Sequence, residues 1–413
     1  MSWLCRSVAC SNNAVTGLLD KGTAKLAGTL AVVAFQVAVM PSFARAADWS
    51  AILTASEKAT YNDNPGLASD PNGQLLGALS TLSLDITGKT RTAKVDFQGD
   101  FTYQKYWGLN GYKARDASLP RLSAALEKYW KTTSFKADAS YSVSPASKTD
   151  LAETDITSSK TNRETFKANA AINKKLDQRN ELNFIARNTT ISYSDGGPTV
   201  TPSTSTGGTV SWLHRATRRI DFTTSAGVDW TLYDNAANSE NLLYFTRAEV
   251  VSRPIRRLKL TAGAGVQYLD AYQDNLLLPG FPRDHTGTLG WTGNAGFDYA
   301  LKTGSISGST RYGYSPTVDG VLQQSLLTTL SADHKINDVS NIGLTARLYM
   351  ADTNGSGSFD ETSLTLTPTY SRTLTRLWRM QASYSFVIAD TGTGTAIQNA
   401  AFLSFSRKFE IVP

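Results

Sequence analysis

The sequence predicts an all-β fold, a transmembrane up-and-down antiparallel β-barrel of about eighteen strands. Three observations predict it. Segments of alternating apolar and polar residues recur along the chain, short and long connections alternate between them, and no stretch after residue 47 is apolar for long enough to form a spanning helix. Because only helices and closed barrels cross a bilayer, a membrane protein with this pattern crosses it with strands.

The alternation is clearest between residues 93 and 107, AKVDFQGDFTYQKYW. Odd positions such as Val95 and Phe101 are mostly apolar, whereas even positions such as Asp96 and Asp100 are polar or charged. Successive side chains of a strand point to opposite faces. The segment therefore predicts a wall with one face toward lipid and the other toward a lumen. A half-buried strand of a soluble sandwich is the alternative.

The first predicted strands follow the same rule. Residues 54–64 form a candidate first strand, and a Pro- and Gly-rich loop follows it at 65–74. Residues 78–87 place Leu82, Leu84 and Ile86 on one face, and a short turn at 88–91 joins them to the clearest strand.

Equivalent segments continue to the end of the chain, with clear alternation at 135–143, 220–230, 258–268 and 378–388. The last one, 400–409, places Leu403, Phe405 and Phe409 on one side, which predicts recognition by the barrel-insertion machinery. The predicted strands start near residues 54, 78, 92, 118, 132, 161, 180, 207, 220, 241, 257, 285, 305, 322, 339, 360, 377 and 400. Sixteen strands are the alternative count, because the segments at 54 and 118 alternate weakly.

The connections separate a barrel from a sandwich. Short turns are centred near residues 88, 131, 177, 217, 254, 303, 337 and 375, and a longer loop follows each hairpin. Short periplasmic turns and longer outer loops are typical of outer-membrane barrels, whereas a sandwich has no reason to keep that order. The sequence therefore predicts a location in the outer membrane, with lipid around the barrel.

The first 46 residues predict a cleaved secretory signal peptide, so the barrel is expected to span residues 47–413. Lys21 and Lys25 precede an apolar run at 26–40, and small residues stand at 44–46 before Ala47. Both cysteines, Cys5 and Cys10, lie in this leader. The mature chain is then expected to have neither disulfides nor cysteine-ligated metals.

The formal net charge of +6 does not indicate a nucleic-acid partner, because the basic residues gather at one end of the predicted barrel. The short turns are net basic and the longer loops net acidic. We expect a periplasmic basic ring that concentrates anionic solutes, although solvated turns also simply tolerate basic residues. The predicted ring consists of Arg218, Arg219, Arg253, Arg256, Arg257, Arg376 and Arg379.

Charged residues of both signs occupy the predicted inner face. They either line a water-filled lumen or pair across a narrow one, and the pattern does not separate these readings. The predicted pore-lining residues are Lys94, Asp96, Asp100, Lys136, Asp138, Asp229, Lys259 and Arg311.

No set of residues predicts catalysis, a cofactor or a metal site. Asp284 and His285 form a weak protease-like pair, and no serine has the spacing that would complete a triad. The loop 352–361 resembles a calcium loop at several places, but its twelfth place is Ser363 where a bidentate glutamate is needed. A Gly-rich hairpin loop is the preferred interpretation, and calcium binding is the alternative.

Tyr61-Asn62-Asp63-Asn64, the hairpin segment 369–374 and the segment 380–384 resemble a family of outer-membrane β-barrel porins. Members are often encoded near exopolysaccharide or sorting-system genes of Gram-negative bacteria. The resemblance covers most of the mature chain. It implies an outer-membrane barrel with a part in solute passage or polysaccharide export, and it implies no catalytic residues.

The sequence-based hypothesis is a porin-like passive channel, for anionic sugars or for exopolysaccharide export. The alternative is a non-conducting structural or surface-recognition barrel that acts through its extracellular loops. An enzyme is the third and weakest hypothesis.

Overall fold

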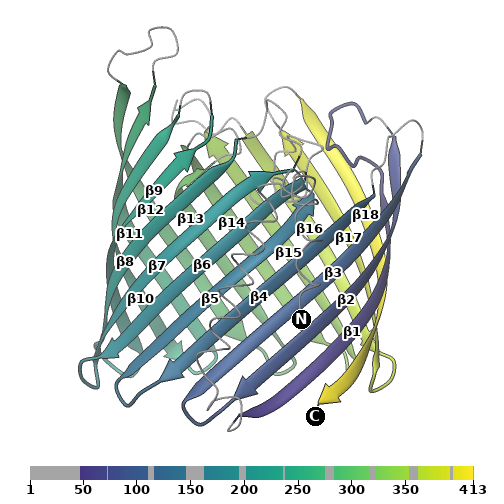
Figure 1. Cartoon of the computed structure of the whole chain (residues 1–413), viewed down its shortest axis with the longest axis horizontal. Helices are drawn as coiled ribbons and strands as arrows, with labels where there is room; N and C mark the ends of the chain where they lie inside the picture. The colour runs from purple at the N-terminus through teal and green to yellow at the C-terminus, as the bar shows by residue number, and fades with distance from the viewer. Residues whose placement is uncertain are drawn as a thin grey trace, which may run out of the picture.

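The structure is a closed antiparallel β-barrel. The computed structural model describes residues 47–71, 73–109, 116–145, 162–194, 201–235, 238–274, 283–316, 322–352, 361–390 and 394–412. They form one 18-stranded sheet in which consecutive strands pair, and β1 pairs with β18 to close it (Figure 1). The predicted all-β barrel of eighteen strands is confirmed, and the alternative count of sixteen is wrong.

The strands are long enough to cross a membrane at a tilt, at 13 to 18 residues each. The first nine are β1 Asp48–Asn62, β2 Gln74–Lys89, β3 Ala93–Leu109, β4 Ala117–Tyr129, β5 Thr133–Pro145, β6 Asn162–Lys175, β7 Asn180–Tyr193, β8 Ser203–Arg215 and β9 Ile220–Tyr233. The second nine are β10 Glu240–Ile255, β11 Leu258–Gln273, β12 Asp284–Ala300, β13 Gly304–Pro316, β14 Leu322–Lys335, β15 Ser340–Asp352, β16 Glu361–Thr373, β17 Trp378–Asp390 and β18 Thr395–Val412.

The strands at the seam differ most from the prediction. β1 begins at Asp48 rather than near residue 54, and β18 begins at Thr395 rather than near residue 400. Asp48 pairs with Lys89 on β2, and Thr395 pairs with Asp390 on β17. These ends are therefore set by ladder pairing with a neighbour, which local alternation does not reveal.

Cross-strand register assigns every strand position to the outer or the inner face, because paired residues share a face. On β3, Phe101 and Tyr103 point outward and are 52% and 44% exposed, whereas Asp100 and Gln104 point inward. Tyr106 shares the inner face, and its hydroxyl donates to Gln104 Oε1. Trp107, the next residue, faces outward and is 49% exposed.

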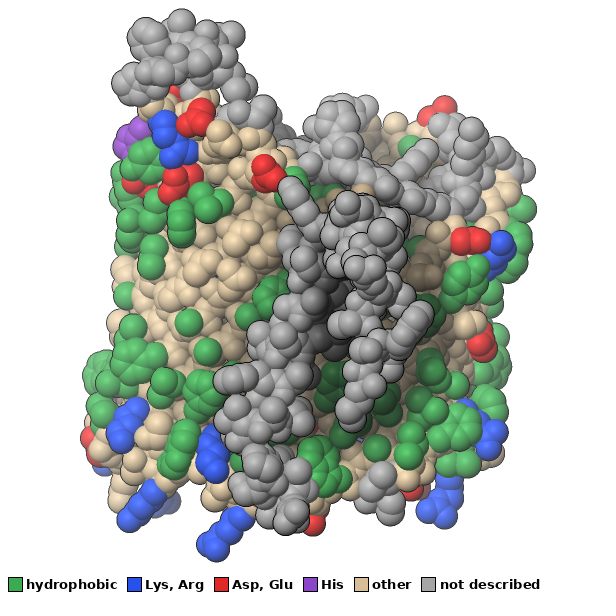
Figure 2. Space-filling model, in the orientation of Figure 1, with side chains coloured by type: hydrophobic (Ala, Val, Ile, Leu, Met, Phe, Trp, Pro, Cys, Tyr) green, Lys and Arg blue, Asp and Glu red, His purple; other side chains and the backbone are tan. Residues whose placement is uncertain are grey.

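The outer face carries many apolar side chains. On the visible face they gather most densely toward the lower edge, and most of the visible Lys and Arg side chains lie at that edge, where the short turns are (Figure 2). Leu289 and Trp291 on β12 are 71% and 68% exposed, as lipid-facing side chains are when no lipid is present. In a closed 18-stranded barrel each strand is hydrogen-bonded to a neighbour on both sides, which meets the need for paired backbone groups within a bilayer. The protein is an outer-membrane β-barrel.

Five of the eight short turns share one device, a side-chain oxygen that accepts backbone N–H groups of the same turn. Thr217 Oγ1 accepts from the backbone nitrogens of Arg219 and Ile220, both at 3.1 Å. The carboxylate of Asp177 takes the same role and also accepts from the Asn180 side chain. The hydrogen bonds from the Asn180 side chain and the Arg179 backbone N–H lower the pKa of the Asp177 carboxyl. These local bonds keep the turns tight, so that one rim of the barrel stays even.

Within the described residues, no helix has the length and hydrophobicity needed to cross a membrane. The predicted signal peptide at 1–46 lies outside the described residues. Residues 353–360 of the calcium-like loop lie outside them as well. The boundary between signal peptide and barrel therefore stays a prediction.

Candidate functional site: the barrel lumen

The structure places all eight predicted pore-lining residues at inner-face positions. Asp96 lies opposite Thr87 on β2 and Ala125 on β4, and Arg311 lies opposite Asn294 on β12 and Leu327 on β14. Because neighbouring inner positions carry Ser, Thr, Asn and Gln, the inner wall is polar along most strands.

Most of these charged residues pair along the wall. The pairs are Lys94 with Asp96 at 2.7 Å, Lys136 with Glu127 at 3.0 Å and Lys259 with Asp298 at 3.5 Å. Each joins positions on one strand or on adjacent strands. Partly exposed pairs of this kind contribute about 0–1 kcal/mol. They compensate charge locally, and none of the three reaches the opposite wall.

Asp229 and Arg187 form a bidentate pair that passes over β8. Arg187 Nε donates to Asp229 Oδ1 at 2.9 Å, and its Nη2 donates to Oδ2. Gly207 lies between them, and a Cβ at this position would collide with Asp229 Oδ1. The glycine thus provides the space through which strands two positions apart are linked.

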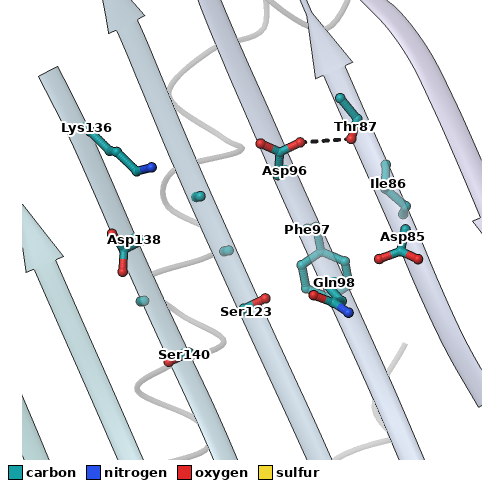
Figure 3. Close-up of a pocket in the computed structure, with 13 residues that line it drawn as sticks. Asp85, Ile86, Thr87, Asp96, Phe97, Gln98, Ser123, Lys136, Asp138 and Ser140 are labelled. Carbon is teal, nitrogen blue, oxygen red and sulfur yellow. Dashed lines mark hydrogen bonds between the residues drawn. The ribbon is translucent and has the colours of Figure 1, made fainter. Parts of the chain in front are cut away.

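A hollow in the inner wall lies over β2 to β5, where small side chains on β4 lower the surface. Its volume is about 400 Å³, and Ser123 and Ala125 lie between taller residues on both sides. Figure 3 shows Asp96 accepting a hydrogen bond from Thr87, with Lys136 and Asp138 on β5 across the hollow. Carboxylates, a lysine and hydroxyl groups therefore line one concave surface.

Six cationic side chains form a belt at one level of the lumen. Each stands seven or eight residues from the short-turn end of its strand and points inward. At about 3.3 Å per residue and a tilt of roughly 40°, this level is some 18–20 Å above the turns, near the middle of the membrane. We call these residues the mid-lumen basic belt: Arg121, Lys167, Arg187, Arg247, Arg311 and Arg347.

Few carboxylates balance this belt. Within the described strands, Asp100 is the one inward carboxylate at the same seven or eight positions, and Asp229 pairs with Arg187. Five belt residues, all except Arg187, have no hydrogen bond or ion pair among the described residues. The belt therefore presents unpaired positive charge to the lumen.

Sequence reasoning found one belt residue, Arg311, among its pore-lining candidates and missed the belt as a unit. Each cation is unremarkable within its own strand. Counting inward positions from every short turn would have found the common level, but that count needs the strand ends that pairing defines.

The seven predicted turn arginines lie at the short-turn end in two clusters, one at the adjacent β8–β9 and β10–β11 turns and one at the β16–β17 turn. Part of their charge is compensated. Arg253 pairs with Asp221 at 2.7 Å, and Arg219 donates to the Pro254 carbonyl. Arg256 and Arg257 line a hollow of about 390 Å³ at this rim.

The inner wall from β16 to β18 is different, because hydroxyl and amide groups replace charges at mid-height. Thr367 donates to Ser385, and Thr369 donates to Ser383. Toward the outer end this side becomes tightly packed, with Val387 2% and Ala389 1% exposed.

The structure does not bring Asp284 and His285 together as a catalytic pair. Asp284 lies at an inner-face position, whereas His285 faces outward, where it pairs with Asp270 and its ring lies against Tyr272. The described residues contain no group of three His, Cys, Asp or Glu side chains that could hold a metal ion.

Comparisons with known proteins concern the fold. No family model matches the chain, and no curated protein matches it. Similar solved structures include the BenF-like porin from Pseudomonas fluorescens Pf-5, with 9% identity, TM-score 0.48 and coverage of 88% of this chain and 99% of that one. OpdK from Pseudomonas aeruginosa has 11% identity, TM-score 0.46 and coverage of 88% and 99%. OccAB4 from Acinetobacter baumannii has 9% identity, TM-score 0.48 and coverage of 88% and 98%.

Proposed function

We propose that this protein is a porin-like passive channel that favours small, hydroxylated anions such as anionic sugars. The mid-lumen basic belt carries the proposal. It sets an excess of positive charge across the middle of the only route that a closed barrel offers to a polar solute.

The width of the barrel supports passage. Barrels of 16–18 strands enclose an aqueous channel unless loops fill it. The lumen-facing ion pairs between described residues run along the wall and join strands no more than two positions apart. Such pairs do not cross-link opposite walls. This supports a water-filled lumen over a narrow one that is closed by ion pairs across it.

The expected selectivity is moderate. One unit charge at about 10 Å in a water-like medium contributes roughly 0.4 kcal/mol. Arg121 lies opposite the carboxylate of Asp100 on β3, which offsets its charge. The other four unpaired cations of the belt, Lys167, Arg247, Arg311 and Arg347, then favour an anion by about 1–2 kcal/mol before screening. Since about 1.4 kcal/mol corresponds to tenfold, a several-fold preference for anions is expected at low salt.

Hydroxylated solutes fit the mixture of walls. The uncharged side between β16 and β18 offers Thr and Ser hydroxyls, and the hollow on β2 to β5 offers carboxylates and Lys136. Hydroxyl, carboxylate and ammonium groups donate to or accept from sugar hydroxyls. Passage of an exopolysaccharide rests on the family resemblance alone. We propose it as a narrower hypothesis that needs a transport assay of its own.

Planar-bilayer recording of the purified barrel in a KCl gradient tests the function. The expected result is a steady conductance with a reversal potential that shows chloride passing more readily than potassium. A barrel that inserts without conductance, or that prefers potassium, contradicts the proposal. Liposome swelling with a sugar acid and the matched neutral sugar then tests the substrate class.

A non-conducting barrel that acts through its outer loops is the second candidate. The observation that favours it is the dense packing of the outer lumen near β15 and β16, where Tyr349 and Ser363 are both 2% exposed and Ala351 is fully buried. Loss of a surface phenotype on outer-loop deletion, in a wild-type barrel without conductance, would support this candidate.

A further inference from the structure

The first outer connection folds back into the barrel instead of extending away from it. Residues 63–71 follow β1 and lie beside the outer ends of β17 and β18 (Figure 1). Leu67 is 8% exposed and packs in one hydrophobic cluster with Val387, Ala389 and Ala396. These three residues occupy inner-face positions of their strands. The connection therefore covers the inner wall.

The side chain of Asn64 makes three of the hydrogen bonds that hold the connection in place. Asn64 is 1% exposed, and its Nδ2 donates to the Ala68 carbonyl at 2.7 Å and to the Ile397 carbonyl at 2.8 Å. Its Oδ1 accepts from the Ala68 backbone nitrogen at 3.0 Å. The side chain thus closes the loop on itself and ties it to β18 at the same time.

Further bonds join Asp63 and the backbone carbonyl of Asn64 to β18. Gln398 Nε2 donates to the Asn64 carbonyl at 2.5 Å, and the backbone nitrogen and Nδ2 of Asn399 each donate to Asp63 at 2.6 Å. Leu67 is held at φ 45°, a left-handed conformation that is uncommon for leucine. A backbone of this kind persists where surrounding contacts over-determine it, so the segment is fixed rather than hinged.

We propose that residues 63–71 act as a fixed size filter at the outer mouth, which sets the largest solute that reaches the mid-lumen basic belt. The segment occupies lumen next to the uncharged β17–β18 side, so it displaces the remaining passage toward the strands that carry the belt. The inference rests on the proposed channel function and adds its size limit.

The test compares two asparagine variants. Asn64→Ala, combined with Leu67→Ala, removes the side-chain bonds of Asn64 and the apolar contact of Leu67 with the inner wall. Asn235→Ala is the matched control, because Asn235 closes the β9–β10 connection in the same way, through bonds to Ser239 at 3.0 Å, without a described bond to the wall of another hairpin. Liposome swelling with neutral sugars of increasing size, together with single-channel conductance, is the readout.

We expect the Asn64→Ala, Leu67→Ala barrel to admit larger sugars, with a several-fold higher rate for a trisaccharide relative to a monosaccharide. Its preference for anions should stay within about twofold of wild type, because the belt is intact. Asn235→Ala should sieve as wild type does. Unchanged sieving in the double variant overturns the filter while leaving the channel, whereas a wild-type barrel without conductance overturns both.

A labelling measurement is independent of conductance. A Leu67→Cys barrel has one thiol once the predicted leader with Cys5 and Cys10 is removed. In the fixed arrangement this thiol reacts slowly with a water-soluble maleimide, and adding Asn64→Ala should accelerate the reaction at least tenfold. Equal rates with and without Asn64 would show that the asparagine pins nothing.

Discussion

Two arcs of the inner wall differ in the groups that they present at mid-height. The arc from β3 to β15 carries the mid-lumen basic belt with carboxylates near it, whereas the arc from β16 to β18 presents Thr, Ser and Gln side chains. Both arcs are polar and both belong to one continuous sheet. The difference teaches that this barrel places its mid-height charges and its neutral hydrogen-bonding groups on separate strands.

Removing belt charge from the first arc should have the largest effect. The triple variant Arg247→Gln, Arg311→Gln, Arg347→Gln is expected to lose most of the several-fold anion preference, because it removes three cations without partners. Reversal potentials at about 0.1 M KCl measure it.

The matched control lies on the second arc. Thr365→Val, Thr367→Val, Thr369→Val removes three inner-face hydroxyls at similar heights and no charge. It should leave the reversal potential unchanged. Equal losses in both triple variants would mean that the arcs do not differ in the way described here.

Raising the salt concentration should lower the wild-type anion preference by no more than the triple belt variant does. Raising KCl from about 0.1 M to 1 M shortens the Debye length from about 10 Å to 3 Å, which is less than the distance from the wall to the middle of the lumen. The wild-type anion preference is therefore expected to fall several-fold, and the size limit for neutral sugars should stay constant. A salt-independent preference would point to a tight binding site instead of a diffuse field.

Releasing Arg187 from its carboxylate should have the smallest effect. Asp229→Asn removes the partner that holds Arg187 across Gly207, so one more cation faces the lumen without compensation. The anion preference is expected to rise about twofold at low salt. Because Asn still fits beside Gly207, the unfolding midpoint in denaturant should change little, and a large drop would assign the pair a structural role.

Much of the fold was predictable because alternation is a local property. Val95, Phe101 and Tyr103 face outward, and Asp96 and Asp100 face inward, as their two-residue period requires. The strand count followed from recurrence of that period and from the order of short and long connections.

The candidate site was predictable only in part. Lys94, Asp138 and Arg311 were identified as inward-facing from their own strands, but their level in the lumen depends on where each strand ends. Arg121, Arg247 and Arg347 were missed for that reason. The bond of Arg187 to Asp229 depends on a glycine of the strand between them, which no spacing along the chain predicts.

The sequence by itself determined the number of strands, the two faces of each and the net basic character of the short-turn end, because side-chain period and turn composition are properties of neighbouring residues. The tertiary structure decided the rest. The strand ends and the register between neighbouring strands brought six cations to one level. Closure of β1 on β18 gave Asn64 partners more than 300 positions away, at Ile397 and Gln398. Such contacts exist only after register and closure have placed distant segments side by side.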